Sequence, residues 1–335
     1  MRQLYRPLLS LITVSSLLLS APIVQANPTP PIDVVASFSI LANITEEIGG
    51  PLVNVTTLVG PDADSHVFNP SPADAKSLAR AQVVVINGLG FEGWIDRLVK
   101  SSGFKGKLVV ASNGVKPLDF KEETKSHAPE QKDSHDHSHK HSHKPKTDHG
   151  KHDHAKHDQG EVDPHAWQDL KNGKIYAENI RAALVAVLPT ARDEINARAK
   201  YYIDQIEALD QDSRMRLNAV PAEQRRVVSS HDAFGYFAQA YDVEFFAAQG
   251  WSTDREVSAA HMATLIREIR KDKVHALFVE NMSDPRLMQR IAEETGVRIG
   301  GKLYSDALSA PGTAADTYLK MFSSNVNTIL QALEP

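Results

Sequence analysis

The sequence Glu161-Val162-Asp163-Pro164-His165-Ala166-Trp167 separates two different kinds of chain. Before it, residues 121–160 are rich in histidine, lysine, aspartate and serine, and hydrophobic residues are almost absent. Such a segment cannot offset the entropy cost of ordering by burying apolar side chains, so it is predicted to be a disordered surface loop. His165 therefore lies at the point where folded chain resumes.

Two long helical patterns follow this stretch. The first covers residues 172–188, carries an apolar stripe and stops before Pro189. The second covers residues 190–218 and would be roughly 43 Å long at 1.5 Å per residue. Because many of its residues are charged, we expect this helix to bridge two lobes of the molecule.

Strand-like and helix-like runs alternate on both sides of these helices. This alternation predicts an α/β protein of two lobes, each with a mainly parallel sheet flanked by helices. The predicted boundaries are 27–189 for the N-terminal lobe, 190–218 for the linker helix and 219–335 for the C-terminal lobe. The predicted strands cover residues 33–38, 52–59, 83–86, 108–111, 226–229, 243–247, 276–279 and 297–299.

The N-terminal residues predict export. Arg2 and Arg6 precede an apolar run that is shorter than the roughly 20 residues needed to span a bilayer. Val24-Gln25-Ala26 has the pattern of a cleavage site, so residues 1–26 are predicted to be a signal peptide cleaved near Ala26. The chain has no cysteine, which excludes disulfides and thiolate metal sites, and a lipid-anchored form is not expected. Removal of the signal peptide changes the net charge from −5 to −7, which is unsuited to nucleic-acid binding.

Three histidines share one kind of position. His66, His165 and His231 each lie in a loop after a predicted strand or before a predicted helix, and Asp306 lies in a similar loop. Ligands of open α/β sheets bind at that edge. Three imidazoles and one carboxylate would complete a tetrahedral zinc site, whereas manganese prefers more oxygen ligands. Each histidine taken singly could also be a hydrogen-bonded loop residue.

The remaining candidates are expected to be structural. His261 lies within a predicted helix and His275 just before a predicted buried strand, so both are interpreted as structural or surface histidines. Four acidic residues could support metal ligands, but turn and cap roles are favoured for them. They are Asp62, Asp64, Glu256 and Glu280.

Several segments together resemble a known family, the periplasmic zinc-binding proteins of ABC importers. These are the cluster A-I solute-binding proteins of the high-affinity zinc-uptake type. The resemblance rests on residues 60–70, 87–94 (Asn-Gly-Leu-Gly-Phe-Glu-Gly-Trp), 163–167, 229–236 and 304–308. It implies two α/β lobes joined by one long rigid helix, with a metal ion bound between them.

The resemblance also implies the ligand set. His66 and His165 would come from the first lobe, and His231 and Asp306 from the second. Manganese-binding relatives typically carry Glu at the position of His231, which favours zinc here. Two departures are that the disulfide of some zinc-binding members cannot form, and that water takes the place of Asp306 in some members.

The sequence thus predicts a periplasmic, monomeric carrier that captures Zn²⁺ and delivers it to an ABC permease in the inner membrane. The alternatives are a manganese- or iron-binding member of the family, a zinc hydrolase and a zinc-dependent adhesin; an enzyme is not expected. The histidine-rich loop is predicted to collect zinc with low affinity, to sense it or to dock a periplasmic metallochaperone. Its auxiliary ligands would be His135, His137, His139, His141, His143, His149, His152, His154 and His157.

Overall fold

The computed structural model describes residues 30–119, 162–254 and 257–334. The helices and strands belong to one compact unit, residues 31–335. The predicted signal peptide, the predicted histidine-rich loop with its auxiliary ligands, and Glu256 lie outside the described residues. No described helix is both long enough and apolar enough to cross a membrane.

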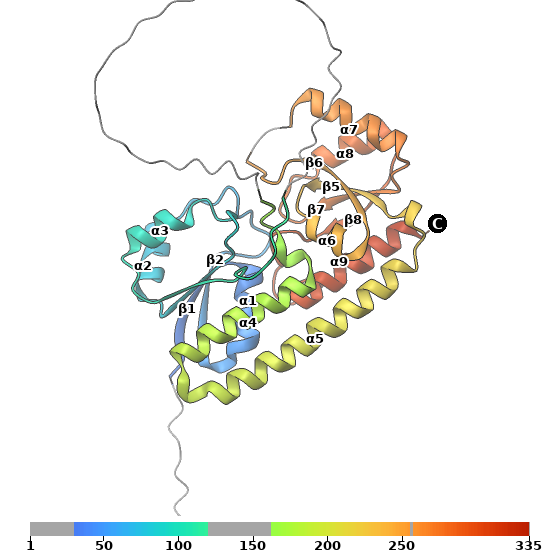
Figure 1. Ribbon diagram of the computed structural model, residues 1–335. Helices are drawn as coiled ribbons and strands as arrows, with labels where there is room; N and C mark the ends of the chain where they lie inside the picture. The colour runs from blue at the N-terminus through green and yellow to red at the C-terminus, as the bar shows by residue number, and fades with distance from the viewer. Residues whose placement is uncertain (1–29, 120–161, 255–256, 335) are drawn as a thin grey trace, which may run out of the picture. The chain divides into compact units, whose positions relative to one another are not determined.

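The first sheet is built from the strands that precede the histidine-rich segment (Figure 1). Its strands are parallel and stand in the order β2-β1-β3-β4. All four residues of β3 are buried, as expected for a central strand covered by helices on both faces. The elements are β1 (Ile32–Phe38), α1 (Ser39–Gly49), β2 (Val53–Val59), α2 (Pro72–Arg80), β3 (Val83–Ile86), α3 (Ile95–Ser102) and β4 (Lys107–Val110).

The second sheet repeats the same arrangement later in the chain. Its parallel strands stand in the order β6-β5-β7-β8. The predicted fold class, two parallel sheets each flanked by helices, is therefore confirmed. The elements are β5 (Arg226–His231), α6 (Gly235–Tyr241), β6 (Glu244–Gln249), α7 (Ala259–Lys271), β7 (Ala276–Glu280), α8 (Arg286–Thr295), β8 (Ile299–Leu303) and α9 (Tyr318–Leu333).

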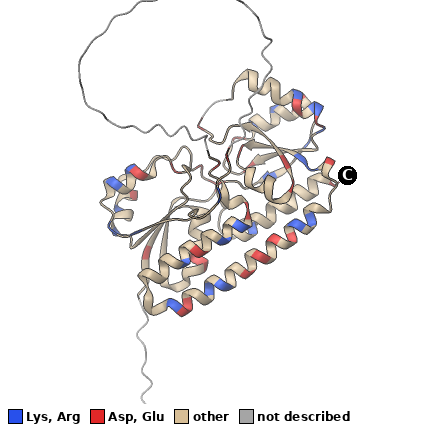
Figure 2. Ribbon diagram, in the orientation of Figure 1, with Lys and Arg blue, Asp and Glu red and all other residues tan. Residues whose placement is uncertain are grey.

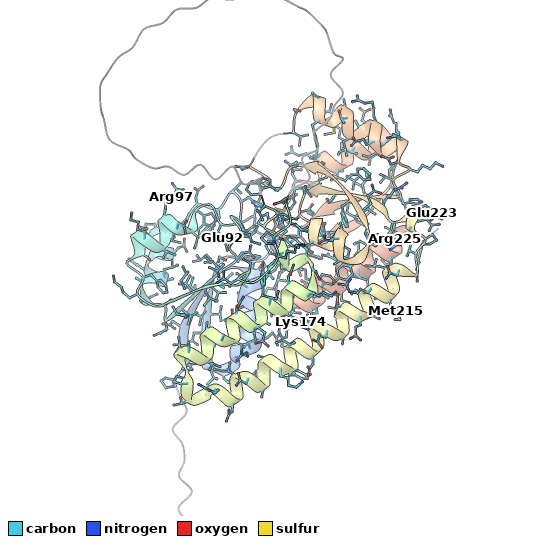
Figure 3. The ribbon with its side chains drawn as sticks, in the orientation of Figure 1. Glu92, Arg97, Lys174, Met215, Glu223 and Arg225 are labelled. Atoms are coloured by element: carbon cyan, nitrogen blue, oxygen red, sulfur yellow. The ribbon has the colours of Figure 1, made fainter. Side chains whose placement is uncertain are left out.

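Two helices connect the sheets. A helical turn at Ala166–Gln168 leads into α4 (Leu170–Val187), and α5 (Arg192–Asn218) then runs for 27 residues as the long helix that links the lobes (Figure 1). Residues of both charges lie along α5 (Figure 2). Lys174 of α4, labelled in Figure 3, forms an ion pair with Glu207 of α5. The helix contacts α1 and α4 as well as α6 and α9, so it packs against elements that precede and follow it.

The described residues form two hydrophobic clusters, of which the larger extends through both halves. It contains strand residues of the first sheet, such as Val34, and of the second, such as Val227. Phe237 of α6 packs against Phe322 of α9 with ring centroids 5.5 Å apart, next to Tyr241. Because large buried apolar interfaces resist domain motion, this shared core opposes wide separation of the lobes.

Most predicted boundaries differ from the structure by one or two residues, and three of the differences concern β5, β8 and α9. β5 extends through His231, so this histidine ends a strand and does not lie in the loop after it. β8 covers Ile299–Leu303 where 297–299 was predicted, because its two glycines have low strand propensity and disguise it. α9 begins at Tyr318 where a start at 313 was predicted, because Thr317 caps it by accepting the Lys320 amide.

Candidate metal centre

The carboxyl ends of strands from both sheets lead to one site. In the first sheet the chain passes from β1 to β2 on one side and then to β3 on the other side, and β5, β6 and β7 repeat this reversal in the second sheet. Open α/β sheets bind ligands at the point where the strand order reverses. His66 comes from the loop after β2, and His165 from the turn before α4. His231 ends β5, and Asp306 follows β8.

The structure brings the four predicted ligands together. One ligand atom from each lies within 4.8 Å of the others. Asp306 Oδ2 is 3.1 Å from both His66 Nε2 and His231 Nε2, and Asp306 Oδ1 is 3.6 Å from His165 Nε2. Four ligands with bonds of about 2.0–2.2 Å in a tetrahedron would be roughly 3.3–3.6 Å apart. The side chains therefore need only small adjustments to surround one divalent ion.

The four side chains are shielded from solvent. His165, His231 and Asp306 are fully buried, and the His66 side chain is 2% exposed. Among the described atoms, Nε2 of His165, both ring nitrogens of His231 and Oδ1 of Asp306 meet no hydrogen-bond geometry, although His231 Nδ1 lies 2.6 Å from Glu280 Oε2. Buried polar atoms without partners are costly, so the two Nε2 atoms and Oδ1, which converge on one point, indicate a ligand site.

Asp163 orients His165. Its Oδ1 accepts the backbone N–H of His165 at 2.9 Å and lies 2.8 Å from the ring Nδ1. An imidazole that donates its Nδ1 proton to a carboxylate leaves Nε2 free as a ligand. Gly235 at the start of α6 permits this arrangement, because a Cβ there would lie 2.5 Å from Asp163 Oδ2. This role of Asp163 was not predicted from the sequence, although an aspartate two residues before a histidine is a signal for an Asx turn.

The side chain of Glu280 contacts His231, so the turn or cap role expected for it is wrong. Its fully buried carboxylate lies at the end of β7, and Oε2 is 2.6 Å from His231 Nδ1. Burial alone would lower the pKa of His231, but the carboxylates of Glu280 and Asp306 raise it well above its usual value. Burial would likewise raise the pKa of Asp306, but the neighbouring His231 and His165 hold it well below its usual value.

Aromatic rings enclose the histidines. The Phe91 ring lies 5.1 Å from that of His66, and the Trp167 ring lies 5.3 Å from that of His165, measured between centroids. The Trp251 ring lies 5.9 Å from that of His66. Trp167 also donates its indole N–H to the carbonyl of Ser305, the residue before Asp306. This bond ties the segment of His165 to that of Asp306.

The loop that carries His66 is bonded to the second half of the chain. Asp62 donates its backbone N–H to the carbonyl of Leu308 at 2.8 Å, and its side chain accepts from Asn281 at 2.9 Å. Asp64 accepts the backbone N–H of His66 at 2.8 Å, which is the expected turn role, and also accepts the Thr253 hydroxyl at 2.6 Å. These bonds hold His66 against the segments that supply the other ligands.

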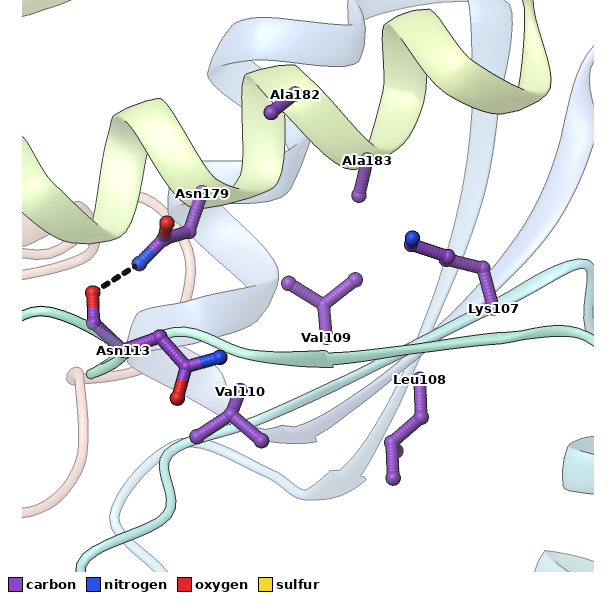
Figure 4. Close-up of a pocket in the computed structure, with 8 residues that line it drawn as sticks. All are labelled: Lys107, Leu108, Val109, Val110, Asn113, Asn179, Ala182 and Ala183. Carbon is purple, nitrogen blue, oxygen red and sulfur yellow. Dashed lines mark hydrogen bonds between the residues drawn. The ribbon is translucent and has the colours of Figure 1, made fainter.

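Other candidate positions lie apart from the centre. His275 is exposed, and His261 lies on α7; neither joins the cluster, in agreement with the prediction. A pocket between β4 and α4 contains none of the four ligands (Figure 4). Asn179 donates to the carbonyl of Asn113 at its edge.

Comparison with known proteins agrees with this geometry. The chain matches the ZnuA family, described as zinc-uptake complex component A, periplasmic, over residues 34–332. It is 30% identical over 332 residues to the metal ABC transporter substrate-binding lipoprotein SloC of Streptococcus mutans, covering 97% of this chain and 98% of that protein. The manganese ABC transporter substrate-binding lipoprotein PsaA of Streptococcus pneumoniae is 29% identical over 308 residues, covering 90% of this chain and 88% of that protein.

Solved structures with the same fold include the periplasmic zinc binding protein TroA from Treponema pallidum. Its TM-score is 0.77 at 27% identity, covering 91% of this chain and all of that one. A Mn-bound periplasmic metal binding protein from Candidatus Liberibacter asiaticus has a TM-score of 0.73 at 27% identity, covering 90% of this chain and all of that one. The family match spans almost the whole described chain, and SloC and PsaA are named as substrate-binding lipoproteins of ABC transporters. The chain therefore belongs to the ZnuA family of periplasmic, metal-binding components of ABC transporters.

Proposed function

We propose that this protein is exported to the periplasm, captures Zn²⁺ through His66, His165, His231 and Asp306, and delivers it to an ABC permease. The observation that supports the proposal is the convergence of three imidazoles and one carboxylate within 4.8 Å. Three nitrogen ligands and one oxygen ligand suit zinc better than manganese, which prefers oxygen-rich shells. Transport is favoured over hydrolysis because Asp306 lies within the ligand set and not apart from it as a base would.

The first experiment tests the site. Competition with a zinc chelator should reveal one tight site in the purified protein. Deletion of residues 126–158 should leave that site intact, whereas His165→Ala should weaken it by orders of magnitude. His275→Ala removes an exposed histidine outside the cluster and serves as the matched control. Loss of the tight site in the deletion variant, or unchanged affinity in His165→Ala, would contradict the assignment.

The second experiment tests the metal. Manganese is the alternative cargo, because several relatives are named manganese-binding proteins. The same titration with Mn²⁺ in place of Zn²⁺ should give a much weaker dissociation constant, since only one of the four ligands is an oxygen. Equal or tighter binding of Mn²⁺ would favour the manganese function.

The histidine-rich segment and the partners form a separate part of the proposal. We infer that the segment binds zinc weakly, since it contains nine histidines between His135 and His157. The deletion variant should therefore lose weak zinc equivalents while keeping the tight one. Membership of the family implies a permease and an ATPase as partners. We propose a monomeric carrier, which light scattering of the zinc-loaded protein would test.

A further inference from the structure

One buried carboxylate contacts both of the segments that supply ligands from the second sheet. Glu280 Oε1 accepts the backbone N–H of His231 at 2.9 Å. Glu280 Oε2 accepts the hydroxyl of Ser305 at 2.5 Å and lies 2.6 Å from His231 Nδ1. Glu280 therefore contacts both the backbone and the ring of His231. It also contacts Ser305, the residue immediately before Asp306.

The chemistry of these contacts determines which nitrogen of His231 faces the metal. A carboxylate oxygen accepts hydrogen bonds, so Nδ1, which lies 2.6 Å from Glu280 Oε2, is the ring nitrogen that would carry the proton of a neutral His231. The lone pair then lies on Nε2, which is the nitrogen 3.1 Å from Asp306 Oδ2. The opposite tautomer would place a proton on the ligand atom.

We propose that Glu280 is a positioning residue that holds His231 in the Nδ1–H tautomer and, through Ser305, sets Asp306 beside it. The inference rests on the proposed function, because it assumes that His231 Nε2 and Asp306 bind the cation. Under this inference Glu280 orients His231 and Asp306, which are two of the four proposed ligands.

Glu92, beside the first sheet, serves as a control for a purely structural role of Glu280. Glu92 is also a buried carboxylate with three donors, namely Ser37 Oγ at 2.6 Å and the amides of Asn87 at 2.6 Å and Gly88 at 3.2 Å. None of these donors is an imidazole. Replacement of either glutamate by glutamine disturbs a buried acceptor, but only replacement of Glu280 can move a proton on a ligand.

The effect of Glu280→Gln follows from the fixed donors. The backbone N–H of His231 cannot change its role, so the glutamine carbonyl must face it, and the amide NH₂ then faces His231 Nδ1 and Ser305. The serine hydroxyl can rotate to accept, but Nδ1 can accept only if its proton moves to Nε2. Carboxylate partners of metal-binding histidines typically contribute about 10–100-fold in affinity. We expect a loss of zinc affinity in that range for Glu280→Gln.

The experiment measures two properties of the full chain with zinc as the probe. Chelator competition gives the zinc affinity of the wild type, Glu280→Gln, Glu92→Gln, Glu280→Asp and His231→Ala. Long-range nitrogen–proton NMR spectra of the metal-free protein, recorded where His231 is neutral, give its tautomer. We expect Nδ1–H in the wild type and Nε2–H in Glu280→Gln. Glu92→Gln should bind zinc within about threefold of the wild type, and Glu280→Asp, which keeps an acceptor, should retain Nδ1–H and recover part of the affinity.

Each outcome separates the inference from the function on which it rests. Wild-type zinc affinity in His231→Ala would refute the proposed metal site itself. If His231→Ala abolishes tight binding but Glu280→Gln weakens it no more than Glu92→Gln does, only the role of Glu280 is refuted. If Glu280→Gln fails to fold, the wild-type spectrum still decides, because an Nε2–H tautomer there would overturn the inference.

Discussion

Gly173 of α4 packs against Tyr318, the first residue of α9. A Cβ at this position would lie 2.5 Å from the hydroxyl oxygen of Tyr318 and 3.0 Å from its Cε1 atom. Tyr318 is fully buried and donates its hydroxyl to the carbonyl of Trp167 at 2.6 Å. Gly173→Ala should therefore push the Tyr318 ring away from its bonding position.

The change in the free energy of unfolding follows from one stabilising and two destabilising contributions. Alanine favours the helix over glycine by about 0.8–1.0 kcal/mol. Forcing a methyl group into a packed core costs about 1–3 kcal/mol. Leaving the carbonyl of Trp167 without its buried donor costs about 1–3 kcal/mol more. Gly173→Ala should thus lower the free energy of unfolding by about 1–5 kcal/mol, although the same substitution stabilises an ordinary helix.

Urea unfolding of the metal-free protein would measure this effect, with a chelator present because bound metal adds stability of its own. Gly93→Ala is the control, since no atom lies within 4 Å of a Cβ at that exposed glycine. In a Tyr318→Phe background, the additional loss from Gly173→Ala should shrink by about 1 kcal/mol or more, because the hydroxyl is already absent. Wild-type stability of Gly173→Ala, or an equal loss in both backgrounds, would refute the reasoning.

Three further predictions concern other parts of the molecule. The pKa of His231 is raised, and a metal-bound imidazole must be unprotonated, so zinc affinity should fall as the pH is lowered. The fall should begin above pH 6.5, which is about the ordinary pKa of histidine. Chelator competition at several pH values would show this fall, and an affinity that does not change with pH would contradict the prediction. Ser71→Ala removes the cap that accepts the Asp74 amide, so α2 should lose about 0.5–2 kcal/mol of protection in hydrogen exchange, with α8 as the unaffected reference. Phe237→Ala should lower the free energy of unfolding by about 3–5 kcal/mol, because this fully buried ring packs against four other aromatic residues. A loss below about 1 kcal/mol in urea unfolding would contradict the packing.

The elements and their order follow from local patterns in the sequence. The short β-branched run Val83–Ile86 indicates a buried strand, and the spacing of apolar residues in Arg192–Asn218 indicates a long helix. The predictions failed where local preference and tertiary packing disagree. A Cβ at Gly300 of β8 would lie 2.6 Å from Ala332 of α9, so glycine is present there for close approach and hides the strand.

The chemical types of the ligands were also contained in the sequence, since three imidazoles and one carboxylate stand next to predicted strands and helices. Only the tertiary structure decided that residues 66, 165, 231 and 306, separated by up to 240 positions along the chain, surround one point. It also decided that Glu280, which resembles a turn residue in the sequence, is the buried partner of His231. The physical reason is that helix and strand preferences act over neighbouring residues, whereas hydrogen bonds to a ligand depend on which distant strands end at the same place.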